Sequence, residues 1–228
     1  PEPLQLVDDF DAAVRACSHV MISVPSKSFG DTLEKLKPLL KAETPVSWAT
    51  KGLTPDSGEF LFDTARRVLG INRPLAVISG PSFAAEVAKG LPTAVTVAST
   101  DAAFATKLAE LMHSQTMRVY TTHDVLGVQI GGTVKNVLAI AAGISDGLGY
   151  GANARAALIT RGMAEIRRLA ASLGAESETM FGLAGIGDVI LTCTDDQSRN
   201  RQLGLAIGNG LSVDQAVKEV GKTVEGIH

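Results

Sequence analysis

The stretch DVLGVQIGGTVKNVLAIAAGIS, Asp124–Ser145, decides how the rest of the chain is interpreted. From Val125 to Ile144 it contains one charged residue, Lys135. At helical spacing the neighbours of Lys135 on its own face are all apolar or small: Val128, Gly131, Gly132, Ala139 and Ala142. An ammonium in such surroundings has to meet an anion, a polar partner or water in a cleft, because an unpaired buried charge is too costly. The pattern is typical of a functional site, and a lysine that extends from a core helix to solvent is an equal alternative.

The composition limits the class of protein. The chain has 228 residues, 45% of them hydrophobic, which is enough for one large core or two ordinary ones. A net charge of −3 without a run of basic residues argues against a nucleic-acid partner. Cys17 and Cys193 are too few for a disulfide framework, and the four histidines lack metal-ligand spacing, so no metal site is predicted.

No secretory signal or transit peptide opens the chain. Val125–Ile144 is long enough to cross a membrane, but its four glycines, Gln129, Asn136 and Lys135 favour a buried helix of a soluble protein. We therefore expect a cytoplasmic protein without a membrane span. The chain begins at Pro1 and stops at His228 directly after an apolar-periodic stretch, so we expect it to be a fragment.

The first half of the chain alternates strand and helix patterns. Strands are predicted at Val20–Val24, Val46–Thr50, Leu75–Ser79, Thr93–Ala98 and Met117–Tyr120, with helices at Ser28–Leu40, Glu59–Leu69, just before Lys89 and at Ala102–Met112. Short apolar strands separated by helices predict βαβ units and a mainly parallel sheet. Ligands of such sheets bind beyond the carboxyl ends of the strands. The turns at Pro25-Ser26, Lys51-Gly52 and Gly80-Pro81-Ser82 follow three of these ends, although each is also an ordinary turn sequence.

The pattern changes after Tyr120. Thr121–Asp124 is predicted to form a capping box, and helical periodicity then continues to the end of the chain. Helices are expected at Asn153–Leu173, Ser198–Gly208 and Val213–Val220. The predicted fold is an α/β layer, residues 1–123, followed by an all-helical domain, residues 124–228.

Two short stretches in the second half carry chemistry. Gly182–Asp188, GLAGIGD, has the wrong spacing for a dinucleotide fingerprint, and we interpret it as backbone in close contact that ends at Asp188. Thr192, four residues later, shares a helical face with Asp188; a helix N-cap is the alternative role for Asp188. Ser198–Arg201, SRNR, combines two guanidiniums, an amide and a hydroxyl at a helix start, which suits a phosphate group. A solvated helix start remains the competing interpretation.

Together these motifs resemble the bacterial NAD(P)-dependent glycerol-3-phosphate dehydrogenases. The resemblance rests on Trp48–Gly52, Ile78–Ala84, Val134–Val137, Gly185–Asp188 and Ser198–Arg201, in the same order and spacing along essentially the whole chain. It implies an incomplete Rossmann-type α/β domain for NAD(P)H, residues 1–123, and a truncated all-α substrate and catalytic domain, residues 124–228. The implied reaction interconverts dihydroxyacetone phosphate and sn-glycerol 3-phosphate, which feeds glycerophospholipid synthesis, and the implied assembly is a homodimer.

The resemblance also implies roles for single residues. Lys135 matches the family's proton donor and acceptor, and Asp188 is placed to orient its ammonium. Lys51 matches a lysine near both cofactor and substrate. The predicted substrate contacts are Lys51, Gly80, Ser82, Lys135, Asp188, Thr192, Ser198, Arg199 and Asn200, and the predicted cofactor contacts are Lys51, Ala84, Arg199 and Glu225.

The sequence departs from the family at both ends. The G-x-G-x-x-G turn that binds the cofactor pyrophosphate, and the family's last helices, do not occur between Pro1 and His228. We therefore expect this chain to bind dinucleotide poorly, and the choice between NADH and NADPH stays open. Two other functions are also open: a related β-hydroxyacid or ketopantoate-type reductase, and a non-catalytic remnant that binds a phosphate ligand.

Overall fold

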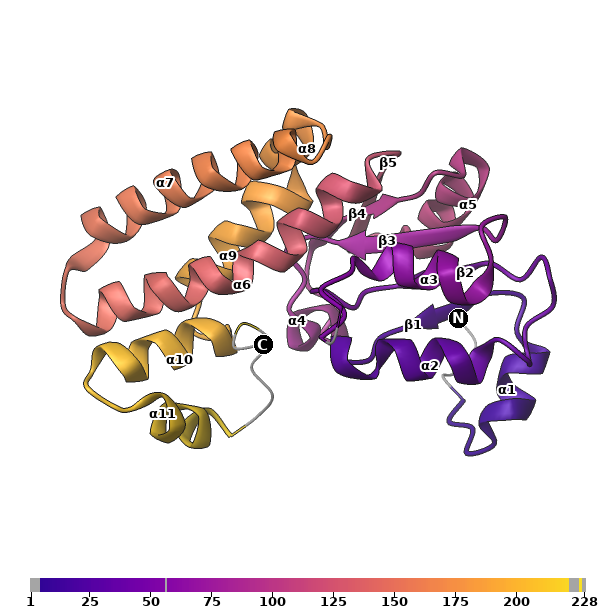
Figure 1. The fold of residues 1–228 in the computed structure, drawn as a ribbon, viewed down its shortest axis with the longest axis horizontal. Coiled ribbons are helices and arrows are strands. Elements are labelled where there is room, and N and C mark those ends of the chain that lie inside the picture. The colour runs from indigo at the N-terminus through magenta and orange to yellow at the C-terminus, as the bar shows by residue number, and fades with distance from the viewer. Residues whose placement is uncertain (1–4, 56, 222–225, 227–228) are drawn as a thin grey trace.

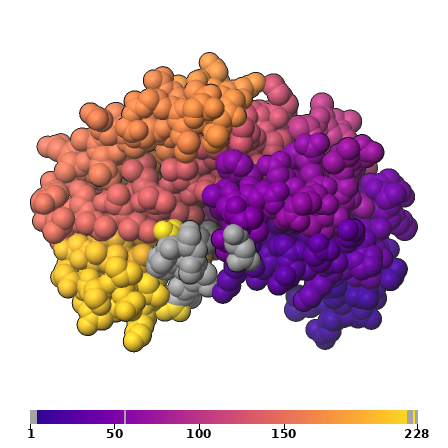
Figure 2. Space-filling model, in the orientation of Figure 1, coloured from indigo at the N-terminus to yellow at the C-terminus, as the bar shows by residue number. Residues whose placement is uncertain are grey.

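A five-stranded sheet and a group of helices are joined by one long helix, α6 (Val125–Gly147) (Figure 1). The computed structural model describes residues 5–55, 57–221 and 226. The space-filling view shows the α/β half and the helical half side by side, meeting near the middle of the molecule (Figure 2). The predicted fold class, a Rossmann-type half followed by an all-helical half, is confirmed.

The sheet has the strand order β1-β2-β3-β4-β5. Its strands are β1 (Val20–Ile22), β2 (Val46–Trp48), β3 (Leu75–Ser79), β4 (Thr93–Ala98) and β5 (Met117–Thr122). Three neighbouring pairs are parallel and the β3–β4 pair is antiparallel, so the prediction of a mainly parallel sheet is confirmed.

The antiparallel pair contradicts the βαβ prediction for one connection. Helix α4 (Ala84–Ala88), which follows β3, has no buried residue and therefore does not cover a face of the sheet. The chain turns at Gly90, where φ is +69°, and β4 runs back beside β3. A crossover helix has to pack on the sheet to bring the next strand in parallel, and α4 is too short and too exposed for that.

Helices cover both faces of the sheet. Successive residues of β3 point to opposite faces of the sheet and belong to different cores. Val77 packs in the cluster of Trp48, and Ile78 packs with Phe104. The helices of this half are α1 (Phe10–Ala16), which the sequence analysis missed, the 3₁₀ turn η1 (Ser26–Ser28), α2 (Phe29–Leu36), α3 (Leu61–Leu69), α4 and α5 (Ala102–Met112). Helix α2 ends earlier than predicted because Pro38 has no backbone N–H to continue the helical hydrogen bonds after Lys37, the C-cap residue.

The helical half is arranged around α6 (Figure 1). Its other elements are α7 (Gly151–Ser172), α8 (Ser177–Phe181), the π-helical turn η2 (Leu183–Gly187), α9 (Asp188–Thr194), α10 (Arg199–Gly208) and α11 (Val213–Val220). The start of α6 differs from the predicted capping box. Asp124 alone caps the helix, because its carboxylate accepts the amide hydrogen of Gly127 at 2.9 Å.

Helix α6 contributes to the cores of both halves. Val125 and Val128 belong to the cluster beneath the sheet, and Leu138 and Ala142 belong to the core of the helical half. Among the described helices, α6 alone is long and apolar enough to cross a membrane by length and composition. More than half of its most apolar window, 56%, is buried within the protein, which is how a core helix is used.

Helices α6 and α10 touch through their backbones. A Cβ on Gly143 would lie 2.1 Å from the carbonyl oxygen of Arg201, and a Cβ on Gly204 would lie 2.0 Å from that of Ile140. Real side chains do not approach this closely. The small residues of α6 and α10 therefore set the distance between the two helices.

This contact predicts that Gly143→Ala and Gly204→Ala each lower the free energy of unfolding by about 1–3 kcal/mol or more, because the added methyl group forces the helices apart. Denaturant melts measure the change. Gly30→Ala in α2 is the matched control: a Cβ there meets nothing within 4 Å, so the variant should gain about 0.5–1 kcal/mol from helix propensity. Equal stability of all three variants would contradict the close packing.

Candidate active site

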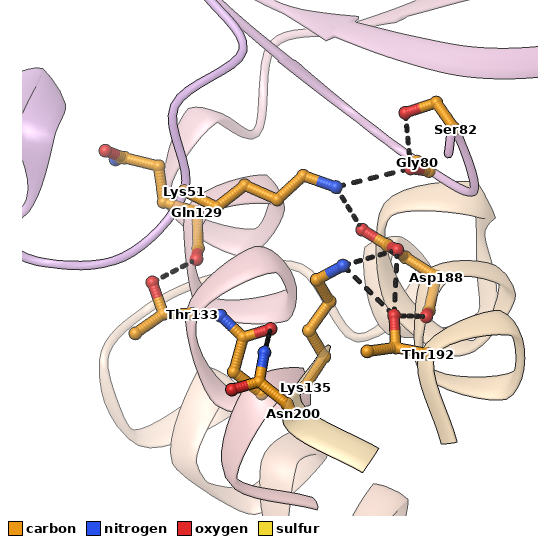
Figure 3. Close-up of polar contacts among 10 residues, drawn as sticks. Lys51, Gly80, Ser82, Gln129, Thr133, Lys135, Asp188, Thr192 and Asn200 are labelled. Carbon is orange, nitrogen blue, oxygen red and sulfur yellow. Dashed lines mark hydrogen bonds and ion pairs between the residues drawn. The ribbon is translucent and has the colours of Figure 1, made fainter. Parts of the chain in front are cut away.

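Four separate elements bring one polar cluster together at the junction of the two halves (Figure 3). Lys51 follows β2, and Gly80 follows β3. Lys135 lies in the middle of α6, and Asp188 is the first residue of α9. Two of the predicted strand-end turns thus lie beside the two predicted residues of the helical half.

Asp188 binds both lysines. Its Oδ1 accepts from the Lys135 ammonium at 2.7 Å and its Oδ2 accepts from the Lys51 ammonium at 2.5 Å (Figure 3). The side chains of Lys135 and Asp188 are 10% and 2% exposed, whereas that of Lys51 is 18% exposed. The lone lysine of α6 is therefore buried and paired, and the alternative that it extends to solvent is wrong.

Thr192 completes the environment of Lys135. Its hydroxyl lies 3.1 Å from the Lys135 ammonium and donates to the backbone oxygen of Asp188 at 2.6 Å. The predicted common face of Asp188 and Thr192 is confirmed. The N-cap alternative for Asp188 is wrong, because Gly187 occupies the cap position and the Asp188 carboxylate faces the two lysines instead.

The glycine-rich segment before Asp188 lies against other backbone, as its sequence indicated. Gly185 has non-helical angles inside η2, and a Cβ on it would lie 2.3 Å from the carbonyl oxygen of Met180. From the other side, a Cβ on Gly131 of α6 would lie 2.2 Å from the carbonyl oxygen of Ala184. This contact brings η2 onto α6, and Asp188 then begins α9 beside Lys135.

The loop after β3 depends on one glycine. Gly80 has a φ of +142°, and a Cβ on it would lie 3.1 Å from the carbonyl oxygen of Ala94. The Gly80 carbonyl oxygen accepts from the Lys51 ammonium at 3.3 Å and from the Ser82 hydroxyl at 3.1 Å. Gly80 and Ser82 therefore belong to the same cluster as Lys51.

Burial and the neighbouring opposite charge have opposing effects on the pKa of Lys135 and on that of Asp188. Burial lowers the pKa of Lys135 from 10.5 to about 8, with help from the positive charge of Lys51 and against the attraction of Asp188. Burial alone would raise the pKa of Asp188, but the two ammoniums outweigh it and hold that pKa below its ordinary value. Protonated Lys135 thus destabilises the fold below pH 8, and this penalty declines as the pH rises from about 8 to 10.5.

The SRNR cluster divides into residues of different kinds. Ser198 is the buried N-cap of α10, and Arg199 is its exposed first residue. Asn200 is buried, and its amide donates at 3.0 Å to the side chain of Asn136, the residue that follows Lys135 in α6. Arg201 is buried and paired with Asp146 and Asp196, so the expectation of two guanidiniums for a phosphate is wrong: only Arg199 is exposed at the surface.

The remaining predicted residues lie at the edges of the site. Ala84 is the exposed first residue of α4, four positions after Gly80. Glu225 lies outside the described residues. Sequence reasoning gave no role to Asn136, Asp146 and Arg155, although Asp146 stands out as the only acidic residue between Val125 and Gly147.

The fold joins an α/β half of Rossmann type to a helical half, and a buried, paired lysine lies at their junction. This combination is typical of the dehydrogenases that consist of a cofactor domain and a helical domain. Comparison with known proteins narrows the class. The family model for the N-terminus of NAD-dependent glycerol-3-phosphate dehydrogenase matches residues 1–105, and that for its C-terminus matches residues 124–228. The chain belongs to this family, which confirms the resemblance seen in the sequence.

Named relatives agree with the family models. The chain is 54% identical over 227 residues to the glycerol-3-phosphate dehydrogenase [NAD(P)+] of Tolumonas auensis, with 99% of the chain and 68% of the relative covered. The identity to the enzyme of Alkalilimnicola ehrlichii is 58%, with 100% and 68% covered. A crystal structure of glycerol-3-phosphate dehydrogenase from Coxiella burnetii superposes with a TM-score of 0.94 at 48% identity, covering 100% of this chain and 69% of that one.

The cluster predicts how the pKa of Lys135 responds to its neighbours. Lys51→Met removes a repulsive charge and should raise the pKa of Lys135 above 8. Asp188→Asn removes an attractive charge and should lower it. A pH titration of the Lys135 ε-carbon by NMR measures both changes. Shifts in the same direction, or a wild-type value near 10.5, would contradict the described contacts.

Proposed function

We propose that the protein interconverts dihydroxyacetone phosphate and sn-glycerol 3-phosphate with NAD(P)H, and so supplies glycerophospholipid synthesis. The observation that carries the proposal is the Lys135–Asp188–Lys51 cluster at the carboxyl ends of β2 and β3, in a chain of this family. An α/β fold binds its ligands beyond the carboxyl ends of the sheet strands.

Lys135 is the proposed general acid and base. Hydride addition to a ketone leaves negative charge on the oxygen, and this alkoxide needs a proton and a positive potential. A lysine with a pKa of about 8 is present in both protonation states near neutral pH, so it gives up a proton in the reduction and takes one in the oxidation.

Asp188 and Thr192 are proposed to orient Lys135, because both lie within hydrogen-bond distance of its ammonium. Lys51 supplies a second positive charge, held by Asp188 and the Gly80 carbonyl oxygen. Its position at the end of β2 suits contact with both substrate and cofactor. Gly80 and Ser82 form the neighbouring wall.

Ser198, Arg199 and Asn200 are the proposed phosphate side of the site. Arg199 and Asn200 stand at the first turn of α10, where free backbone N–H groups and the helix dipole favour an anion. The exposed guanidinium of Arg199 adds bidentate donors. Asn200 links this end of α10 to α6 one residue after Lys135.

The residues present fit a nicotinamide cofactor at the same edge. The turns after β2 and β3 contain Gly52, with a φ of +108°, and Gly80, and neither turn carries a bulky side chain at these positions. Lys51, Ala84, Arg199 and Glu225 are the residues that we propose hold the cofactor. When bound, the nicotinamide exchanges a hydride with the substrate carbon. The alternation of protonation states at Lys135 is this chain's own contribution.

Further parts of the proposal concern organisation. We infer a boundary near Asp124 between a cofactor domain, residues 1–123, and a substrate domain, residues 124–228, because α6 begins directly after this residue and belongs to the core of the helical half from Ile130 onward. We also infer a cytoplasmic homodimer. The support for both properties is the resemblance to the family.

A reduction assay with dihydroxyacetone phosphate tests the function. We would assay the 228-residue chain, and a chain extended at both ends to the length of its relatives, with NADH and with NADPH. Lys135→Met should lower kcat by roughly 10²–10⁴-fold through loss of proton transfer, with the fold retained. Lys35→Met, an exposed lysine of α2, is the matched control and should keep wild-type turnover. Preference for a carboxylated over a phosphorylated ketone would favour the ketopantoate-type alternative.

The two directions of the reaction should depend oppositely on pH. Reduction needs protonated Lys135, so its kcat should fall as the pH rises through about 8. Oxidation needs the neutral amine, so its kcat should rise through the same range and then level off. Parallel profiles in the two directions would exclude Lys135 as the group that transfers the proton.

A further inference from the structure

Asp146 in the last turn of α6 binds arginines from two other helices. Its Oδ2 accepts from the Arg201 guanidinium at 2.7 Å, and both of its oxygens accept from Arg155 of α7, at 2.9 and 2.8 Å. The side chains of Asp146 and Arg201 are each 9% exposed, and that of Arg155 is 28% exposed. Arg201 also pairs with Asp196, in the loop before α10. Asp146 is thus the node of a largely buried network across three helices.

Both terminal nitrogens of Arg201 are directed at carboxylates: Nη1 binds Asp196 and Nη2 binds Asp146. Its Nε is buried and has no hydrogen-bond partner among the described residues. The forked end of the guanidinium, which would bind an anion, is therefore already occupied. Releasing it would leave the mostly buried carboxylate of Asp146 with one partner fewer. An uncompensated buried charge is strongly destabilising. Arg201, the second of the two arginines that the SRNR motif predicts for a phosphate, therefore has another role.

Arg201 belongs to the contact that places α10 on α6. At the start of α10, the Asn200 amide binds Asn136, one residue after Lys135. Farther along, Gly143 and Gly204 bring the two backbones into contact. Close glycine packing sets the distance between the helices but leaves sliding and rotation poorly restrained, because it has no directional polar contact. The Arg201–Asp146 ion pair, one helical turn of α6 beyond Gly143, adds a charged directional contact to the Asn200–Asn136 hydrogen bond at the start of α10.

We propose that Arg201 is a positioning residue for the reaction: its ion pair with Asp146 holds α10 in register with α6 and thereby sets where Ser198, Arg199 and Asn200 stand relative to the Lys135 ammonium. The proposal rests on the proposed function, since the ligand that these residues take is the phosphate of the substrate. Arg201 acts on that ligand through α10 and does not touch it.

Substitutions of the two arginines that bind Asp146 test this role. Arg201→Gln should raise KM for dihydroxyacetone phosphate at least tenfold, with a smaller change in kcat, because the phosphate side shifts while Lys135 stays in place. Arg155→Gln is the matched control: it breaks the other arm of the Asp146 network, toward α7, and should keep KM within twofold. An unchanged KM in folded Arg201→Gln, or an equal rise in both variants, would overturn the proposal.

Asp146→Asn separates positioning from direct binding by the sign of its effect. If Arg201 positions α10, loss of the carboxylate should raise KM as Arg201→Gln does. If Arg201 instead binds the phosphate directly, freeing it from Asp146 should lower KM. Arg201→Lys serves where either variant fails to fold, since it keeps the charge but loses the two-pronged geometry, and it should show an intermediate rise in KM. A KM for Arg201→Lys equal to that of the wild type would also overturn the proposal.

A readout without turnover distinguishes failure of this proposal from failure of the proposed function. The side-chain amide signals of Asn200 report its hydrogen bond to Asn136 in an NMR spectrum of the protein. Arg201→Gln should shift these signals and Arg155→Gln should leave them in place. If Arg201→Gln shifts these signals but the wild-type protein does not reduce dihydroxyacetone phosphate, then Arg201 does position α10 and the proposed substrate is wrong.

Discussion

The structure depends on one carboxylate shared by two ammoniums. Asp188 receives Lys135 from the connecting helix and Lys51 from the end of a strand, so this buried side chain binds to both the helical half and the α/β half. Neither lysine could be buried so deeply without it, because an unpaired ammonium would cost more than the packing around it returns. The same balance holds the pKa of Lys135 near 8, so this contact between the halves also sets the protonation of the group that we propose as the acid and base.

Small residues make that contact possible, and they act on several sides of one helix. Gly131 lets the turn before Asp188 lie directly on α6, and Gly143 lets α10 do the same farther along. A helix with larger residues at these places would keep its neighbours at ordinary side-chain distance. The position of Asp188, and that of the first turn of α10, then follow from backbone contact on α6. Glycine in this helix serves close approach of backbones, which outweighs its low helix propensity.

Local patterns predicted most of the elements and failed where two segments had to be placed relative to each other. Strands β3 and β4 and helix α5 match their predicted ends, because each is a short apolar run or a helical period that turn residues bound. The direction of β4 was not predictable in this way, because a strand pattern is the same in either orientation. Arg199 and Arg201 look equivalent in the sequence, yet one is exposed and the other is bound to Asp146.

The sequence by itself determined the alternation of strands and helices, the single charge within α6 and the family to which the motifs belong. These are properties of local periodicity and of residue identity at fixed spacing. Only the tertiary structure decided which charges meet: Lys51 and Asp188 are 137 residues apart, and Arg201 and Asp146 are 55 apart. The physical reason is that pairing of buried charges depends on distances of a few ångströms, which are set by how whole helices pack and not by the spacing of residues along the chain.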